Sequence, residues 1–204
     1  MHTAILTFDG YNELDSLIAL GVLNRVPGSR ASIASPTPRV TSMNGVTIDA
    51  TIRLEEACTA DAVIVGSGSK TREVVEDPAI MSTLARLDPA RQLLAAQCSG
   101  TLVLAELGLL DAVPACTDLT TKPWVLAAGV EVLNQPFFAR GTLATAGGCL
   151  ASTYLATWVL ARLHGLEAAE HAMHYVAPVG EKDEYIERAL RNVTPYLEPA
   201  AISA

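Results

Sequence analysis

The sequence lacks an excess of positive charge. Its 14 Lys and Arg residues are outnumbered by 22 Asp and Glu residues, which gives a formal net charge of −8 and an isoelectric point near 4.9. Nucleic acids and anionic membrane surfaces attract basic proteins, so this balance argues against both as partners. Moderate acidity also keeps a protein soluble, and that alone is a sufficient explanation of the charge.

Long apolar runs are missing as well. No uninterrupted apolar stretch approaches the ~20 residues that a membrane-spanning helix needs, so no membrane partner is expected. The opening MHTAILTFDG contains no basic segment followed by an apolar signal core. The cysteines are far apart and form no CxxC pair, which is typical of a reduced protein rather than a disulfide framework. We therefore expect a cytoplasmic protein; its four cysteines are Cys58, Cys98, Cys116 and Cys149.

Histidine is scarce and poorly placed for catalysis. None of the four histidines follows an obvious strand, so we interpret them as structural or exposed; they are His2, His164, His171 and His174. The last two, with Glu167 or Glu170, have the residue types of a metal site but no third ligand cluster to support one. Accordingly, no metal and no cofactor are expected.

What the sequence does contain is an alternation of apolar runs and helical patterns. Half of its 204 residues are hydrophobic and 18% are charged, which is enough for one domain with a substantial core. The predicted strands are AILTF, ASIAS, ADAVIV, RQLLAAQ and GTLATAGG. The predicted helices are NELDSLIALGVLNR, DPAIMSTLARL, SGTLVLAELGLL and CLASTYLATWVLARLHG. Because the strands are apolar on both faces, we expect an α/β three-layer sandwich with a mostly parallel central sheet.

Local signals refine this organisation. Asn44-Gly45 marks the turn of a hairpin, and Asp77 followed by Pro78 is typical of a helix N-cap and first position. Gly165 is expected to end the long helix. No linker or repeat divides the chain, so we predict a single domain over residues 1–197 and a C-terminal tail over residues 198–204.

The stretch AQCSG points to chemistry. Ligands of a parallel sheet bind beyond the carboxyl ends of the strands, and Cys98 lies between a predicted strand and a predicted helix. Small residues flank it at the spacing of a nucleophile elbow, a sharp turn that presents the central side chain. A helix N-terminus favours a thiolate there, and its free N–H groups, from Cys98 or Ser99, can stabilise an oxyanion. The alternative is a buried structural cysteine.

Two other strand ends offer partners for that thiol. GSGSK lacks the spacing of a phosphate loop; we expect Gly68 to supply a second oxyanion N–H, although an ordinary tight turn explains the glycines equally well. The first strand is followed by Asp9, Glu13 and Asp15. Glu13 and Asp15 point in different directions on a helix, so at most one faces the site as a general acid or base. Acidic residues at a helix start also serve simply to stabilise the helix.

Together these motifs resemble the ThiJ/PfpI superfamily. The segments closest to its isonitrile hydratase-like branch are LDSLIALGVL, DAVIVGSGS…VVEDP and CSGTLVLAELGLL, with LATAGGCLASTYLATWVL downstream. The resemblance implies a flavodoxin-like fold, similar to class I glutamine amidotransferases, and a homodimer. Two features depart from the branch: GSG stands where PGG is common, and LDSLIAL is not followed by Gly-Pro.

The resemblance also implies roles for individual residues. Cys98 matches the nucleophile and Asp15 its partner carboxylate, while Gly68 and Ser99 match the oxyanion-loop and post-nucleophile positions. Asp118 falls where many members have a third-position histidine, so a histidine-based triad is not expected.

The sequence therefore predicts a cysteine-dependent hydratase or hydrolase acting on a small electrophilic substrate, with isonitrile hydration as the leading reaction. Two alternatives use the same cysteine: glyoxalase or deglycase chemistry on 2-oxoaldehydes, and a non-enzymatic redox-sensing stress protein. Trp124, Phe137 and Tyr11 are candidates for lining the pocket, and equally for core packing.

Overall fold

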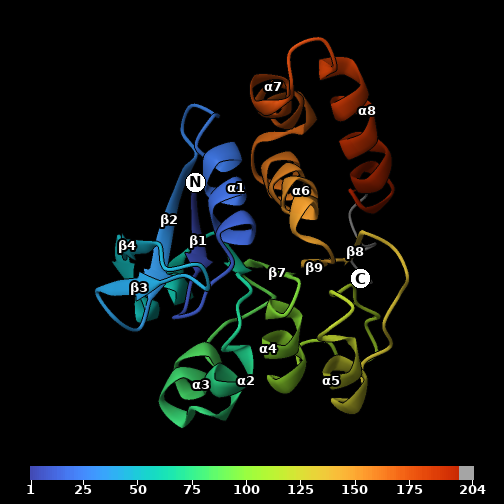
Figure 1. Cartoon of the computed structure of the whole chain (residues 1–204). Helices are drawn as coiled ribbons and strands as arrows, with labels where there is room; N and C mark the ends of the chain where they lie inside the picture. The colour runs from blue at the N-terminus through green and yellow to red at the C-terminus, as the bar shows by residue number, and fades with distance from the viewer. Residues whose placement is uncertain (198–204) are drawn as a thin grey trace.

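A seven-stranded sheet forms the centre of the molecule. In the computed structural model, which describes residues 1–197, its strand order is β5-β2-β1-β6-β7-β9-β8 (Figure 1). All neighbouring strands are parallel except β8 and β9. The strands are β1 (His2–Leu6), β2 (Arg30–Ser35), β5 (Ile52–Arg53), β6 (Ala62–Val65), β7 (Leu93–Gln97), β8 (Phe137–Arg140) and β9 (Leu143–Ala146).

Helices cover both faces of this sheet, which confirms the predicted α/β sandwich (Figure 1). One layer contains α1 (Glu13–Leu23), α6 (Ser152–His164), α7 (Leu166–Val176) and α8 (Lys182–Val193). The other contains α2 (Thr71–Glu76), α3 (Pro78–Leu84), α4 (Gly100–Glu106) and α5 (Lys122–Ala127). Short 3-10 segments complete the chain: η1 (Leu54–Thr59), η2 (Cys149–Ala151) and η3 (Thr194–Tyr196).

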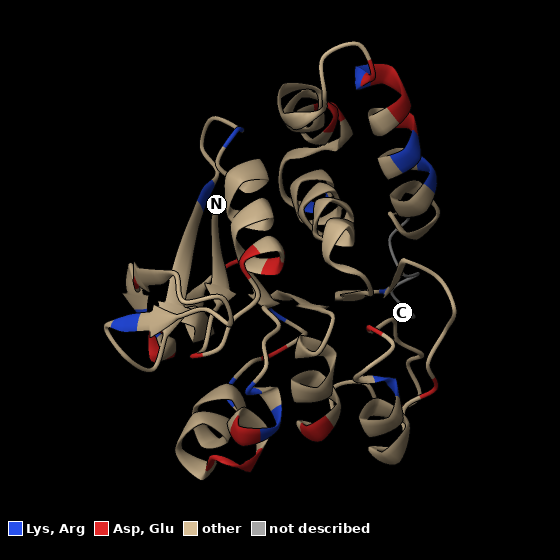
Figure 2. Cartoon of the chain, viewed as in Figure 1, with Lys and Arg blue, Asp and Glu red and all other residues tan. Residues whose placement is uncertain are grey.

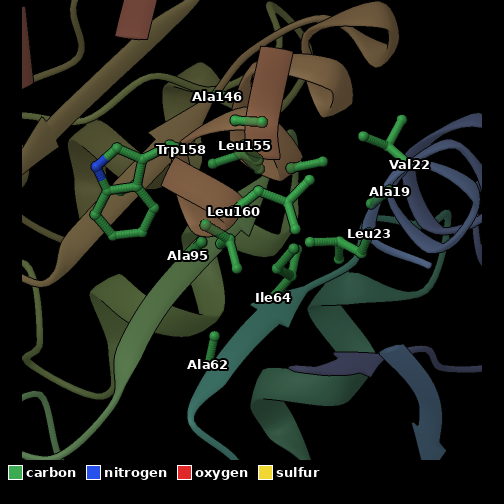
Figure 3. Close-up of a cluster of buried hydrophobic side chains, with 14 of the residues drawn as sticks. Ala19, Val22, Leu23, Ala62, Ile64, Ala95, Ala146, Leu155, Trp158 and Leu160 are labelled. Carbon is green, nitrogen blue, oxygen red and sulfur yellow. The ribbon is translucent and has the colours of Figure 1, made fainter. Parts of the chain in front are cut away.

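Each face of the sheet has its own hydrophobic core because successive strand side chains point to opposite faces. Ile64 of β6 and Ala95 of β7 face the α1 and α6 layer, where they join a cluster with Leu23, Leu155 and the fully buried Trp158 (Figure 3). The alternate strand residues pack into a second cluster with α2, α3 and α4; they include Leu6, Val63, Val65, Leu94 and Ala96. This two-sided burial explains why the strands read as continuous apolar runs.

Several local predictions are confirmed. The hairpin forms from β3 (Arg39–Thr41) and β4 (Thr47–Asp49), with Asn44-Gly45 in its turn. The Asp77 side chain accepts hydrogen bonds from the N–H groups of Ala79 and Ile80 at the start of α3.

The structure also differs in part from the elements expected from the sequence. The helix predicted over residues 99–110 ends at Glu106, because the chain turns at Gly108 with a φ of 71°. The antiparallel edge strand β8 and the helix α7 were not predicted. The predicted tail, residues 198–204, lies outside the described residues.

Charged residues are concentrated away from the sheet. In Figure 2 the ribbon of α8 carries both acidic (red) and basic (blue) residues, whereas the central strands carry few of either. No helix among the described residues combines the length and apolar character needed to cross a membrane.

A close approach between β6 and α4 positions the turn at Cys98. A Cβ added to Gly100 would lie 2.4 Å from the Val65 carbonyl oxygen and 2.8 Å from that of Gly66. Both obstacles are backbone atoms of the neighbouring strand end, so neither can move cheaply. Glycine at position 100 therefore allows α4 to start directly beside the sheet.

We predict that Gly100→Ala lowers the free energy of unfolding by ~1–3 kcal/mol, the usual cost of overpacking. The matched control is Gly21→Ala in the interior of α1, where an added Cβ meets nothing within 4 Å. That change should be neutral or stabilise by about 0.5–1 kcal/mol, because glycine is a poor helix former. Urea unfolding measures both, and equal stability of Gly100→Ala and the wild type would contradict the packing argument.

Candidate active site

Cys98 occupies a strained turn between β7 and α4. Its φ is 46°, the left-handed region that non-glycine residues rarely adopt. Its N–H donates to the Ala146 carbonyl at 2.8 Å, which continues the pairing of β7 with β9 by one residue. Ser99 then takes up helical angles, and α4 begins at Gly100. This is the geometry of a nucleophile elbow, and holding it costs on the order of 1–3 kcal/mol elsewhere in the fold.

Three reactive side chains converge at this turn. The sulfurs of Cys98 and Cys149 and a carboxylate oxygen of Asp15 all lie within 4.8 Å of one another. They come from the end of β7, from η2 after β9 and from the first turn of α1. Cys98 and Asp15 are the two catalytic candidates expected from the sequence, whereas Cys149 was not predicted as a residue of the site.

Asp15 is fully buried, with no exposed surface. One carboxylate oxygen, Oδ2, accepts a short hydrogen bond from Ser67 Oγ, while Oδ1 has no hydrogen-bond partner among the described residues. Burial raises the pKa of Asp15, although the Ser67 hydroxyl and the two nearby thiol groups lower the pKa in part. A carboxyl group with a raised pKa and a free oxygen is suited to accepting and returning a proton.

Glu13 faces elsewhere, which confirms that only one of the two carboxylates points into the site. It accepts a short hydrogen bond from Ser42 Oγ and a second from Asn44 Nδ2 at 2.9 Å, so it joins α1 to the β3–β4 hairpin. Asp9 lies at the surface, 3.8 Å from Lys70 Nζ.

The electrostatics differ from those expected of an elbow cysteine. Burial raises the pKa of the Cys98 thiol well above its ordinary value, and the charge of Asp15 raises it further. The same two causes raise the pKa of Cys149. The helix N-terminus was expected to favour the thiolate, but burial and the neighbouring carboxylate act on the pKa of Cys98 in the opposite direction. The helix that follows, α4, has only seven residues.

Two amide side chains connect the parts of the site. Gln97 Nε2 lies 3.4 Å from Cys98 Sγ and donates to the Gly148 carbonyl at 2.9 Å. Asn12 caps α1 by accepting from Leu14 N–H, and its Nδ2 donates to Cys149 Sγ at 3.2 Å.

Sequence reasoning missed Gln97, Asn12 and Cys149. The signal for Cys149 was available, because this cysteine directly follows the predicted strand GTLATAGG. That this strand is the neighbour of β7 became visible only in the fold.

The glycine loop after β6 lies beside the elbow. The Gly68 N–H donates to Ser99 Oγ at 3.1 Å, and that hydroxyl also lies 2.7 Å from Thr71 Oγ1. Gly68 therefore supports the Ser99 side chain in this structure, and its use as a donor to substrate stays a prediction.

Asp118 follows Thr117 in the loop before α5. Its Oδ1 accepts hydrogen bonds from the N–H groups of Thr120 and Thr121, and its charge contributes to the raised pKa of Asp15. It also lines a pocket of about 460 Å³ with Thr117, Gly147 and Gly148. Thr117 Oγ1 donates to the Cys98 carbonyl at 2.8 Å, so this pocket adjoins the elbow.

The candidate side chains expected to line a pocket are distributed differently. Phe137 and Tyr11 are buried, with 2% and 1% exposure. Phe137 belongs to the core and contacts Tyr196 edge to face. Trp124 packs against the second core and beneath Arg72. None of the three lines the pocket beside Cys98.

The histidines take no part in the three-residue group. His2 Nε2 lies 3.0 Å from Ser32 Oγ at the amino end of β1, and His164 lies in the last turn of α6. His171 and His174 are in α7. Among the described residues, Asp15, Cys98 and Cys149 form the one group with metal-ligand proximity, so the His/Glu set of α7 does not assemble.

Comparison of the sequence with models of known protein families identifies one family. The model of the DJ-1/PfpI family matches residues 1–162. No functionally curated protein matches the chain.

Solved structures share the fold at low identity. DJ-1 from Schizosaccharomyces pombe is 15% identical, with a TM-score of 0.77 over 87% of this chain and 100% of that one. A DJ-1 superfamily protein from Salmonella typhimurium, solved as a cysteine-to-alanine mutant, is 23% identical, with a TM-score of 0.75 over 87% and 98%. An AraC family transcriptional regulator from Pseudomonas putida is 17% identical, with a TM-score of 0.71 over 86% and 99%. The shared fold thus occurs in proteins with different roles.

The electrostatics of the site predict how Cys98 reacts with iodoacetamide. Because Asp15 raises the thiol pKa, Asp15→Asn should lower that pKa and increase alkylation of Cys98 at pH 8; each unit of the change gives about tenfold more thiolate. Peptide mapping by mass spectrometry follows Cys98 separately, and Cys58 near η1 serves as the internal control. Superimposable pH–rate profiles for the variant and the wild type would show that Asp15 does not act on the thiol.

Proposed function

The chain belongs to the DJ-1/PfpI family, and from that premise we propose that it is a cysteine-dependent hydratase of small electrophilic carbon compounds, with isonitriles as its substrate class. The supporting observation is the pairing of Cys98 with a buried carboxylate, Asp15, in place of a histidine. Such a pair favours a reaction in which the substrate carbon must itself receive a proton.

The first step joins the sulfur of Cys98 to the isonitrile carbon. Because the pKa of the thiol is raised, a thiolate does not form in advance, and Asp15 accepts the thiol proton as the C–S bond forms. Asp15 then returns this proton to the same carbon. The product is a thioimidate, with the sulfur bonded to a CH group that is doubly bonded to nitrogen. One carboxylate thus serves first as base and then as acid.

Water completes the reaction. It adds to the thioimidate carbon and the nitrogen gains a proton, which gives a tetrahedral intermediate bearing sulfur, hydroxyl and amine. The C–S bond then breaks as the carbonyl forms, and the departing sulfur recovers a proton. The sum is addition of one water to R–NC to give the formamide R–NH–CHO, with the enzyme unchanged.

Backbone donors beside the elbow would stabilise the developing charge. The Cys98 N–H is committed to Ala146 and the Gly68 N–H to Ser99 Oγ. We therefore assign the main donor role to the Ser99 N–H, with Gly68 contributing if the Ser99 hydroxyl turns away. The pocket of Thr117, Asp118 and Gly148 is the proposed place for the substrate's R group, and Asp118 influences the reaction through the pKa of Asp15.

Hydration of p-nitrophenyl isonitrile, followed by chromatography of the formamide, tests the proposal. Cys98→Ala should abolish turnover, and Asp15→Asn should lower kcat by about 10²–10⁴-fold, the usual contribution of a general acid–base. Cys58→Ser removes a cysteine away from the site and should leave kcat unchanged.

Turnover that survives in Cys98→Ala would overturn the proposal. Turnover of methylglyoxal with no reaction of the isonitrile would assign the same residues to 2-oxoaldehyde chemistry, through a hemithioacetal at Cys98.

We further propose that the protein acts as a cytoplasmic homodimer. Leu14 of α1 and Leu150 of η2 are 49% and 71% exposed, and their two elements contact each other beside the site. Covering such apolar surface stabilises association.

Sedimentation equilibrium should give twice the chain mass of 21.5 kDa. Leu150→Glu should shift the protein towards monomer, whereas Val179→Glu, at a 93% exposed position between α7 and α8, should not. A monomeric wild type would refute the dimer.

A further inference from the structure

Cys149 has no part in the reaction proposed above, yet it lies in the same site. Its sulfur and that of Cys98 are within 4.8 Å. The two cysteines follow neighbouring parallel strands, β7 and β9, whose Gln97 and Ala146 are register partners. Asn12 Nδ2 holds the Cys149 sulfur at 3.2 Å. The fold therefore brings two thiols, 51 positions apart in the chain, together beside one carboxylate.

We propose that Cys149 is a resolving thiol, which converts Cys98 oxidised by a hydroperoxide into an intramolecular Cys98–Cys149 disulfide. The modification site is this pair, and the co-reactant is a small hydroperoxide such as hydrogen peroxide.

The disulfide forms in two steps, oxidation of Cys98 and attack by Cys149. In the first, the sulfur of Cys98 attacks the peroxide, the O–O bond breaks, and Cys98 becomes a sulfenic acid while an alcohol or water leaves. Asp15 accepts the thiol proton in this step. In the second, the sulfur of Cys149 attacks the sulfenic sulfur, the S–O bond breaks, and water leaves as the disulfide forms. Two thiols thus lose two electrons, and one peroxide is reduced.

The geometry favours the second step over further oxidation. The two sulfurs lie within 4.8 Å of each other, whereas a disulfide bond is about 2.05 Å long. The sulfurs therefore have to approach each other by less than about 3 Å for the bond to form. Cys149 is partly exposed, whereas Cys98 is 4% exposed. A nearby thiol therefore reaches the sulfenic acid more readily than a second peroxide from solvent.

The other two cysteines offer no comparable partner. Cys116 is fully buried, and its N–H is bound to Thr145 Oγ1. The Cys58 thiol lies in η1 and donates to the Thr83 carbonyl at 3.5 Å. Neither belongs to the group formed by Asp15, Cys98 and Cys149.

The disulfide would have a functional consequence that rests on the proposed hydratase function. Cys98 in a disulfide cannot attack a substrate, so oxidation would stop turnover, and a small dithiol would restore it. Without a resolving thiol, Cys98 would continue to the sulfinic and sulfonic acids, from which dithiols do not recover it.

The test treats the whole protein with hydrogen peroxide and reads the products by intact mass and peptide mapping. The wild type should lose about 2 Da, the mass of two hydrogen atoms, and yield a Cys98–Cys149 linked peptide. Cys149→Ser and Cys149→Ala should instead gain about 32 to 48 Da on Cys98, the mass of the sulfinic and sulfonic acids, and no longer recover with dithiothreitol. Cys58→Ser is the matched control and should behave as the wild type. Circular dichroism before treatment confirms that each variant is folded.

Two results would overturn the proposal. One is a wild type in which Cys98 gains oxygen while Cys149 stays reduced. The other is a disulfide formed between two chains, seen on a non-reducing gel. The disulfide test measures the mass of the protein and its peptides, so its result does not depend on whether the protein turns over a substrate. A protein that forms the disulfide but hydrates no isonitrile refutes only the enzymatic function, and one that hydrates isonitriles but forms no disulfide refutes only the resolving role.

Discussion

The site depends on the parallel pairing of β1, β6, β7 and β9. Parallel strands have their carboxyl ends at one edge of the sheet, and the loops that follow them meet there. The bond from the Cys98 N–H to the Ala146 carbonyl is the last rung of the β7–β9 ladder. It fixes where β7 stops, so the turn that displays the sulfur begins at Cys98. The loop after β6 and the first turn of α1 then supply Ser67 and Asp15.

A buried carboxylate beside two thiols defines the chemistry of this edge. Taking Asp15 out of water is costly, and one hydrogen bond from Ser67 satisfies only part of the carboxylate. Burial raises the pKa values of Asp15, Cys98 and Cys149 alike. Such a site is suited to the proton transfer between sulfur and carboxylate that we propose for the hydratase reaction, and it differs in this from sites that use a cysteine–histidine pair.

Much of the fold was predictable because each signal was local. Buried strands such as VIV and LLAA are apolar on both faces, the Asn44-Gly45 turn specifies a hairpin, and Asp77-Pro78 specifies a helix start. The elbow was recognisable for the same reason, since a nucleophile flanked by small residues is a pattern of neighbours. The edge strand β8 escaped prediction because its FFAR has no distinctive alternation, and its position is set by antiparallel pairing with β9.

Side-chain size and periodicity over short stretches were enough to predict the fold class and the turn at Cys98. They also indicated that at most one of Glu13 and Asp15 faces the site, whereas the choice of Asp15 came from the family resemblance. The tertiary structure alone decided that Cys149 joins Cys98, that Asn12 and Gln97 hold the two sulfurs, and that burial raises the thiol pKa. These properties arise from strand order and from distances between residues far apart in the chain. Desolvation and through-space charge depend on the whole surroundings of a group, which no short stretch of sequence contains.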